Sequence, residues 1–112
     1  MRRGRLAAGV VLLAVVVSGC ATVSGEDARA LVQGGALLLD VRSPEEFAAG
    51  HLDGAVNIPV DALEARLDEV GPKERAVVVY CRSGVRSRRA RALLLGRGWV
   101  KVENLGAMGN WR

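Results

Sequence analysis

The sequence predicts an α/β fold in which an open, twisted and mostly parallel sheet carries helices on both faces. Residues 76–80 are apolar throughout and residues 36–41 are apolar apart from Asp40, as expected of strands buried on both faces. Segments with helical spacing of apolar residues alternate with these strands, which is typical of parallel sheets with helical crossovers. In such sheets the ligand site lies beyond the carboxyl ends of the strands, next to Asp40 and to the residue that follows Tyr80.

The N-terminal segment is expected to be an export signal outside the fold. Arg2, Arg3 and Arg5 form a basic region, and residues 6–17 form an uncharged apolar stretch. These twelve residues are fewer than the about 20 that a membrane-spanning helix needs, so a permanent transmembrane helix is the weaker alternative.

Residues 17–20, Val-Ser-Gly-Cys, resemble a lipoprotein box. The resemblance implies cleavage before Cys20 and attachment of lipid to this residue. We therefore expect a signal peptide over residues 1–19, a lipidated Cys20 and short linker over 20–23, and one domain over 24–112. The lipid would hold the domain on the membrane of the cell envelope. If the box is a coincidence, the alternative is a disulfide between Cys20 and Cys81.

The domain opens with a helix, a strand and a second helix. Ser24 and Asp27 have capping-box spacing, so a helix is predicted from Ser24 to the glycine pair that begins at Gly34. The strand at 36–41 follows. Pro44 suits the first turn of a short helix that extends to about residue 49.

The middle of the chain contains a short strand and a third helix. Residues 55–58 are predicted to be a strand closed by Pro59. Asp61 is predicted to be the N-cap of a helix that continues to Gly71-Pro72, because Glu64 follows at capping-box spacing and apolar residues keep a helical period.

The last third of the chain contains the strand at 76–80, an Arg-rich helix at 87–95 and a final strand at 99–105. Between the first strand and the helix, the backbone must reverse around Cys81. The N–H groups at a helix start have no internal partners and can hold an anion or lower the pKa of a thiol. Cys81 is therefore a candidate nucleophile, although free cysteines are commonly small apolar core residues.

The charge balance gives no support to nucleic-acid binding. The chain has a formal net charge of +4, and removal of the three N-terminal arginines leaves 13 basic and 12 acidic residues. Arginines do cluster around and after Cys81, and a solvated helix face is the usual explanation of such a run. We assign function only to Arg82 and Arg86, which lie inside the loop.

Four segments of the chain carry the motifs of one known family: Leu38 to Phe47, Gly50 to Pro59, the loop Cys81 to Ser87, and Leu105 to Trp111. These segments resemble signatures of the rhodanese-like sulfurtransferases, and of their single-domain members in particular. They occur in the family's order, and the resemblance extends over residues 24–112.

The resemblance implies that Cys81 takes a sulfane sulfur from an anionic donor such as thiosulfate, forms a persulfide, and passes the sulfur to cyanide or to a thiol. It implies no cofactor. Asp40 and Arg42 match supporting positions, where the carboxylate accepts bonds from loop N–H groups or pairs with arginine. Ser87 is expected to donate to the sulfur, to cap the helix, or both. The expected binding residues are Arg82, Ser83, Gly84, Val85, Arg86 and Ser87.

Other functions are weighed against this one. Cysteine-dependent phosphatases and arsenate reductases need Arg six positions after the Cys, where this chain has Ser87. A non-catalytic binding module is the second alternative. His51 matches a structural corner rather than a general base, both tryptophans are expected to pack, and no cluster has the spacing of metal ligands. The donor, the acceptor and the oligomeric state stay open.

Overall fold

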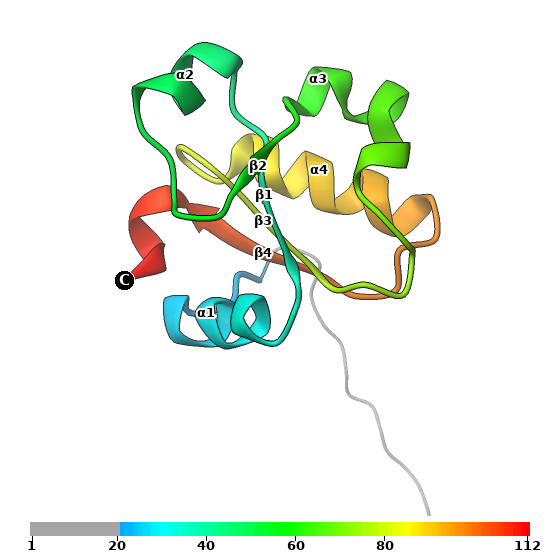
Figure 1. Cartoon of the computed structure of the whole chain (residues 1–112), viewed down its shortest axis with the longest axis horizontal. Helices are drawn as coiled ribbons and strands as arrows, with labels where there is room; N and C mark the ends of the chain where they lie inside the picture. Colours follow the sequence, from blue (N-terminus) through cyan, green and yellow to red (C-terminus); the bar gives the residue numbers. More distant parts are fainter. Residues whose placement is uncertain (1–20) are drawn as a thin grey trace, which may run out of the picture.

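Four parallel strands form one sheet in the order β2-β1-β3-β4, as the predicted fold class requires (Figure 1). This architecture comes from a computed structural model, which describes residues 21–112. The strands are β1 (Leu37–Asp40), β2 (Val56–Asn57), β3 (Val77–Cys81) and β4 (Val102–Ala107). The α-helices are α1 (Gly25–Gln33), α2 (Pro44–Ala49), α3 (Val60–Leu63) and α4 (Val85–Gly96). Two 3₁₀ helices complete the fold: η2 (Glu64–Glu69) and η3 (Met108–Trp111).

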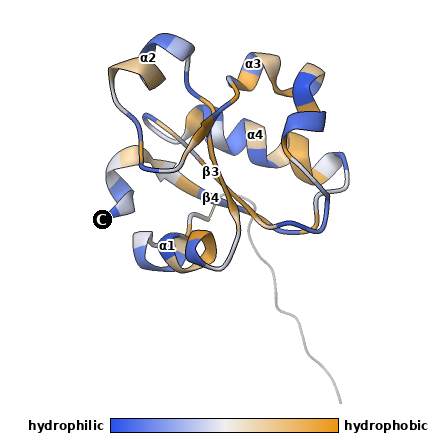
Figure 2. Ribbon diagram, in the orientation of Figure 1, coloured by the Kyte–Doolittle hydropathy of each residue, from blue (hydrophilic) through white to orange (hydrophobic). Residues whose placement is uncertain are grey.

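Helices cover both faces of the sheet, which confirms the predicted layering. Alternate residues of the central strands point to opposite faces, as the β geometry requires. On one face Leu39 and Val79 pack with buried residues of α3 and α4, including Leu63 and Leu94. On the other face a second cluster packs against α1 and η3; its members include Ala28, Leu38, Val78, Tyr80 and Leu105. Figure 2 shows the apolar central strands between these layers.

The edge strand β4 contains a bulge that brings its end next to the turn after β3. Val79 pairs with Asn104, but Tyr80 pairs with Gly106, so Leu105 is an extra residue on β4. The Asn104 carboxamide oxygen accepts a 2.8 Å hydrogen bond from the Gly106 N–H. Gly106 has a φ of 84°, which is in the left-handed region that favours glycine.

The predicted third helix is the clearest error of the sequence analysis. It begins two residues early, at Val60, with Pro59 as its N-cap, so Asp61 lies in its first turn and is not the cap. It also breaks at Arg66, whose φ of −124° and ψ of 28° are not helical. The break lies within η2, and the fully buried Leu63 and Val70 on either side of it both pack into the same core.

Two further elements begin two or more residues away from the predicted position. Helix α4 begins at Val85 and not at residue 87, because Gly84 turns the chain with a φ of 103° immediately after β3. Strand β4 begins at Val102 and not at Trp99, because Trp99 belongs to the turn after α4, where its N–H donates to the Leu94 carbonyl. Trp99 is nevertheless buried, as the packing interpretation predicted.

The expected signal peptide and the lipidated Cys20 lie outside the described residues. Among residues 21–112, no helix combines the length and the apolar character needed to cross a membrane. The end of the linker is described and lies against the sheet, where the Val23 N–H donates a 2.9 Å hydrogen bond to the Asn104 carbonyl oxygen.

Candidate active site

Cys81 is the last residue of β3 and lies at the carboxyl edge of the sheet, with no exposed surface. The chain turns over three residues and then enters α4, so the first turn of this helix faces back toward the thiol. Gly84 makes the reversal possible, since its φ of 103° is unfavourable for residues with a Cβ.

Two backbone N–H groups and one hydroxyl lie around the Cys81 sulfur. The backbone N–H of Gly84 lies 3.0 Å from Sγ, and the backbone N–H of Ser87 lies 3.4 Å from it. The Ser87 hydroxyl oxygen is 3.5 Å from the same atom. Burial raises the pKa of the Cys81 thiol, but the hydrogen bonds from Ser87, Gly84 and Ser83 outweigh burial, so the net pKa is lowered. The loop therefore favours the thiolate.

Ser87 is the third residue of α4, where its N–H and its hydroxyl both face the thiol. The helix N-cap is Gly84, which has no side chain, so Ser87 is not the N-cap that one of the two expected roles required. Its hydroxyl lies 3.2 Å from the Gly84 carbonyl oxygen, to which it donates. The hydroxyl also lies beside Sγ, but its single proton goes to this carbonyl, so the other expected role, donation to the sulfur, is not the bond that the structure shows.

Arg86 was expected inside the loop but is the second residue of α4, and it is already paired. Its guanidinium makes two hydrogen bonds to the Glu46 carboxylate of α2, at 2.7 and 3.1 Å. Glu46 also accepts the Ser43 N–H as part of the α2 capping box. The bond from Arg86 is the main reason that the pKa of Glu46 falls to about 2. Arg86 thus ties the loop to α2, and part of its charge is neutralised by this acid.

Arg82 differs from Arg86 because it is exposed and has no acidic partner among residues 21–112. It borders a hollow of about 300 Å³ beside the loop. The hollow is lined by Arg42, Glu46, Ala49, Gly50, Arg82 and Met108. Of the two loop arginines expected to attract an anionic donor, Arg82 is the one left free to do so.

Asp40 and Arg42 form a buried ion pair at the end of β1, which matches one of the two expected roles. The Arg42 guanidinium donates 2.7 Å and 3.0 Å hydrogen bonds to the two carboxylate oxygens. The Tyr80 hydroxyl also donates to Asp40, at 2.7 Å, and burial raises the pKa of Tyr80. Arg42 further donates to the Gly50 carbonyl oxygen. This cluster fixes the corner at Gly50 and the edge of the Arg82 hollow.

The single histidine is engaged locally. The His51 ring stacks on Phe47 with a centroid separation of 3.6 Å, and its Nδ1 is 2.8 Å from the Phe47 carbonyl oxygen. These contacts support the structural corner that was expected. The described residues contain no group of three or more side chains able to hold a metal ion.

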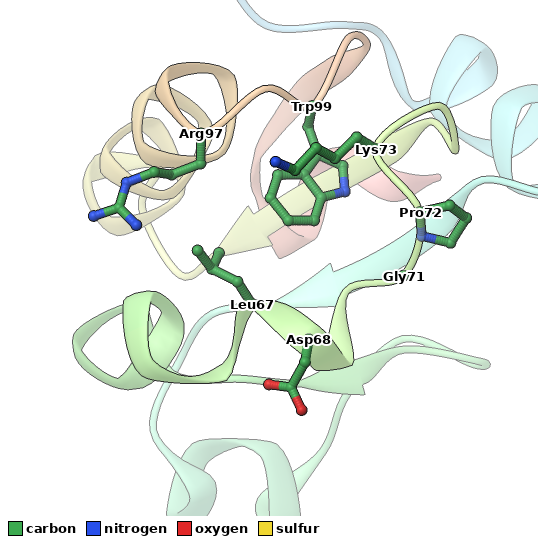
Figure 3. A pocket seen from close by; sticks show the side chains of 7 residues that line it. All are labelled: Leu67, Asp68, Gly71, Pro72, Lys73, Arg97 and Trp99. Carbon is green, nitrogen blue, oxygen red and sulfur yellow. The ribbon is translucent and has the colours of Figure 1, made fainter.

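A second cavity lies at the opposite end of the sheet and shares no residue with the site. It measures about 440 Å³ and lies between η2, the turn before β3 and the turn after α4 (Figure 3). The Trp99 ring forms one wall, with the Lys73 amine 5.5 Å from the ring centroid. The carboxyl edge of the sheet is therefore not the only hollowed end of the domain.

Sequence reasoning missed three side chains of the site. Glu46 was recognised only as a first-turn acid, although it holds Arg86 across 40 positions of sequence. Tyr80 was assigned to a buried strand, but its hydroxyl bonds to Asp40 and to the Leu52 N–H. Met108 lines the Arg82 hollow. The spacing of Ser43 and Glu46 is that of a capping box, and such a pattern indicates a local role only.

A parallel α/β sheet that places one buried thiol beside backbone N–H groups of a turn and of a helix start defines a class of cysteine-dependent sites. The particular family is shown by comparison, since the rhodanese-like domain matches residues 24–112. The chain belongs to the rhodanese-like family.

Characterised relatives are named as sulfurtransferases. A "Sulfurtransferase" of Allochromatium vinosum is 45% identical over 69 residues, which cover 62% of this chain and 64% of that protein. A "Thiosulfate:glutathione sulfurtransferase" of Homo sapiens is 34% identical, and the match covers 85% of this chain and 96% of that protein. The solved structure "Human Single Domain Sulfurtranferase TSTD1" superposes with a TM-score of 0.71 at 36% identity, over 80% of this chain and 93% of that one.

Proposed function

We propose that this protein is a sulfurtransferase that carries a sulfane sulfur as a persulfide on Cys81. The observation that carries the proposal is the convergence of the Gly84 and Ser87 N–H groups on a thiol whose pKa is lowered. The names of its relatives point to the same reaction class.

The first half-reaction loads the sulfur. The Cys81 thiolate attacks the outer sulfur of thiosulfate, a bond forms between the two sulfurs, and the bond to the sulfonate sulfur breaks. Sulfite leaves with the electron pair of that bond. In the second half-reaction, cyanide or an acceptor thiolate attacks the outer sulfur of the persulfide, and the Cys81 thiolate leaves. Covalent catalysis of this kind divides one transfer into two displacements.

The residues around Cys81 have different roles, which follow from their positions. The N–H groups that now face Sγ are placed to hold negative charge on the transferred sulfur, as backbone nests do for anions. Arg82 attracts the dianionic donor from solvent, and Arg86 keeps the loop in register through Glu46. Val85, which is exposed, lies between Arg82 and Arg86 in the chain.

The test is intact-protein mass spectrometry after exposure to thiosulfate. We expect a gain of one sulfur atom on Cys81, reversed by cyanide with formation of thiocyanate. Cys81→Ser should reduce this activity by roughly 10³-fold or more, because a serine hydroxyl is a far weaker nucleophile at ordinary pH. A Cys81→Ser variant with the wild-type rate would refute the mechanism.

We further propose that the protein is a lipoprotein of the cell envelope, anchored through Cys20. The support is in the sequence, where a basic region, an apolar stretch and a lipoprotein-like box precede Cys20. Two or more acyl chains give stable anchoring, whereas one chain gives marginal binding. Labelled fatty acid should enter the wild-type protein but not Cys20→Ala. Mature protein without lipid, cut at another residue, would disprove the anchor.

A further inference from the structure

We propose that the linker side of the active-site loop is the surface on which the anchored domain rests against anionic lipid headgroups. The proposal rests on the lipid anchor proposed above and adds the orientation of the domain and the chemistry of its partner. Three features carry it: the place where the linker meets the domain, a guanidinium without an acidic partner, and an exposed apolar side chain.

The linker is held beside the active-site loop. The Val23 N–H donates a 2.9 Å hydrogen bond to the Asn104 carbonyl oxygen. The Thr22 methyl carbon lies 3.3 Å from the position that a Cβ on Gly106 would take, and the Gly106 Cα lies 3.6 Å from the corresponding position on Gly84. Cys20 is two residues before Thr22, so the chain allows at most about 7 Å between them. A lipid on Cys20 would therefore bring this side of the loop to the bilayer.

The linker, the loop and the end of β4 enclose a hollow of about 210 Å³, which we call the linker hollow. Its lining includes Thr22, Gly84, Val85, Arg88, Gly106 and Asn110. Val85 has 59% of its surface exposed although it is apolar. Apolar side chains at such positions insert into the boundary between headgroups and acyl chains.

Arg88 supplies the charge. It is exposed, and its guanidinium has no acidic partner within residues 21–112. The neighbouring arginines of the same helix differ, since Arg89 pairs with Asp61 at 3.2 Å and Arg86 pairs with Glu46. Arg97, at the far end of the helix, pairs with Glu64. The Arg88 guanidinium, next to the linker, is therefore a positive charge of α4 that no acid compensates. An anionic membrane surface would attract such a charge.

This orientation leaves the route of the donor open to water. The Arg82 hollow lies against α2 and η3, and it shares no lining residue with the linker hollow. The domain can therefore contact lipid through Val85 and Arg88 while Arg82 stays accessible to a soluble anion. A sulfur acceptor would then be met at the membrane surface.

The test uses the lipidated protein, reconstituted into vesicles of phosphatidylcholine with phosphatidylglycerol. A fluorophore is attached to one cysteine, introduced as Val85→Cys or Val100→Cys in the Cys81→Ser background. Both valines are exposed, at 59% and 69%, but Val100 lies at the opposite end of the sheet, before β4. Nitroxide lipids should quench the Val85 probe at least about fivefold more than the Val100 probe, since quenching falls steeply with distance from the bilayer.

Charge reversal separates a lipid contact from the tether alone. Arg88→Glu should weaken docking to phosphatidylglycerol vesicles by roughly fivefold or more, read as the ratio of quenched to unquenched probe. Arg89→Glu makes the same change in net charge on the next residue and should have little effect.

Three failures can be told apart. Acylated protein whose Val100 probe is quenched as strongly as its Val85 probe would overturn the orientation. Equal effects of the two arginine variants would overturn the role of Arg88. Protein whose intact mass shows no acyl chain on Cys20 would overturn both the anchor and this proposal, while the persulfide assay would still decide the sulfurtransferase activity independently.

Discussion

Strands β1 and β3 lie side by side and each ends in a fully buried polar group. The two groups differ in how their charge is balanced by the residues around them. The Asp40 carboxylate has a guanidinium and a phenol as partners, so its charge is neutralised and its oxygens are occupied. The Cys81 sulfur accepts bonds from backbone N–H groups and lies beside one hydroxyl, and no cation of the described residues bonds to it.

The difference separates a structural polar cluster from a reactive one. A buried ion pair with every lone pair satisfied fixes geometry and has no capacity for a ligand. A sulfur that is stabilised by dipoles and not neutralised by a counter-ion keeps its negative charge available for attack. The predictions below test this contrast, from the largest expected effect on stability to the smallest effect on rate.

Asp40→Asn should cause the largest loss of stability. It leaves the Arg42 guanidinium, which is 6% exposed, without a neutralising partner. Removing one partner of a buried pair costs about 3–5 kcal/mol of unfolding free energy, which urea titration measures. The control is Asp61→Asn, which removes the exposed partner of Arg89 and should stay close to wild type. Equal losses of stability in the two variants would show that the buried pair contributes no more than the exposed one.

Gly84→Ala should affect both stability and chemistry. The φ of 103° would cost a residue with a Cβ about 1–3 kcal/mol. A shift of the Gly84 N–H away from Sγ would also raise the Cys81 pKa, so the rate of thiol alkylation would rise at higher pH than in wild type. Gly96→Ala is the control, because Gly96 has space for a Cβ and no positive φ. An unshifted alkylation profile would mean that the loop N–H does not tune the thiol.

Glu46→Gln should make stability depend differently on pH. The folded-state pKa of Glu46 is lowered from 4.5 to about 2, so its pairing with Arg86 stabilises the fold above about pH 4.5. This contribution is lost as the pH falls from 4.5 through about 2. The stability difference between wild type and variant should therefore be full at pH 7 and shrink toward pH 2. Parallel pH curves would contradict the assignment, and Glu45→Gln provides the comparison.

Arg82→Ala should have the smallest effect, and it should appear in KM. The exposed guanidinium attracts the donor through solvent, so its loss should raise KM for thiosulfate a few-fold and lower kcat less. Added salt should slow the wild type at low donor concentration more than it slows the variant. Arg89→Ala serves as the control with equal loss of charge. A variant that retains the salt dependence of the wild type would place Arg82 on a merely solvated surface.

The sequence allowed the sheet to be predicted because its central strands are almost wholly apolar, and burial on both faces leaves little choice of structure. The place of Cys81 at the carboxyl edge of the sheet could be predicted because it follows such a strand and opens a short glycine-containing turn. The start of α4 was missed, since the reversal depends on the φ of Gly84, which composition does not reveal. The break at Arg66 was missed because a helical period of apolar residues continues across it.

The pairing of Arg86 with Glu46 was beyond local reasoning for a different reason. The capping box explains Glu46 fully within α2, so no feature of the sequence calls for a second partner. The carboxylate has two oxygens, and the fold brings Arg86 to them from 40 positions away. A sequence pattern that accounts for one hydrogen-bond partner of a side chain does not reveal a second, distant partner of the same side chain.

The complete burial of Cys81 has a consequence for chemical protection. A thiol without exposed surface is shielded from bulky disulfides and oxidants, while thiolate character still makes it reactive toward small molecules that enter the loop. A sulfur added to it extends the side chain by the length of one S–S bond, about 2 Å. In the resting enzyme the thiol would thus be buried. In the persulfide form the outer sulfur would extend farther from the backbone than the thiol does. Burial would then select by size both the acceptors that remove the sulfur and the oxidants that inactivate the thiol.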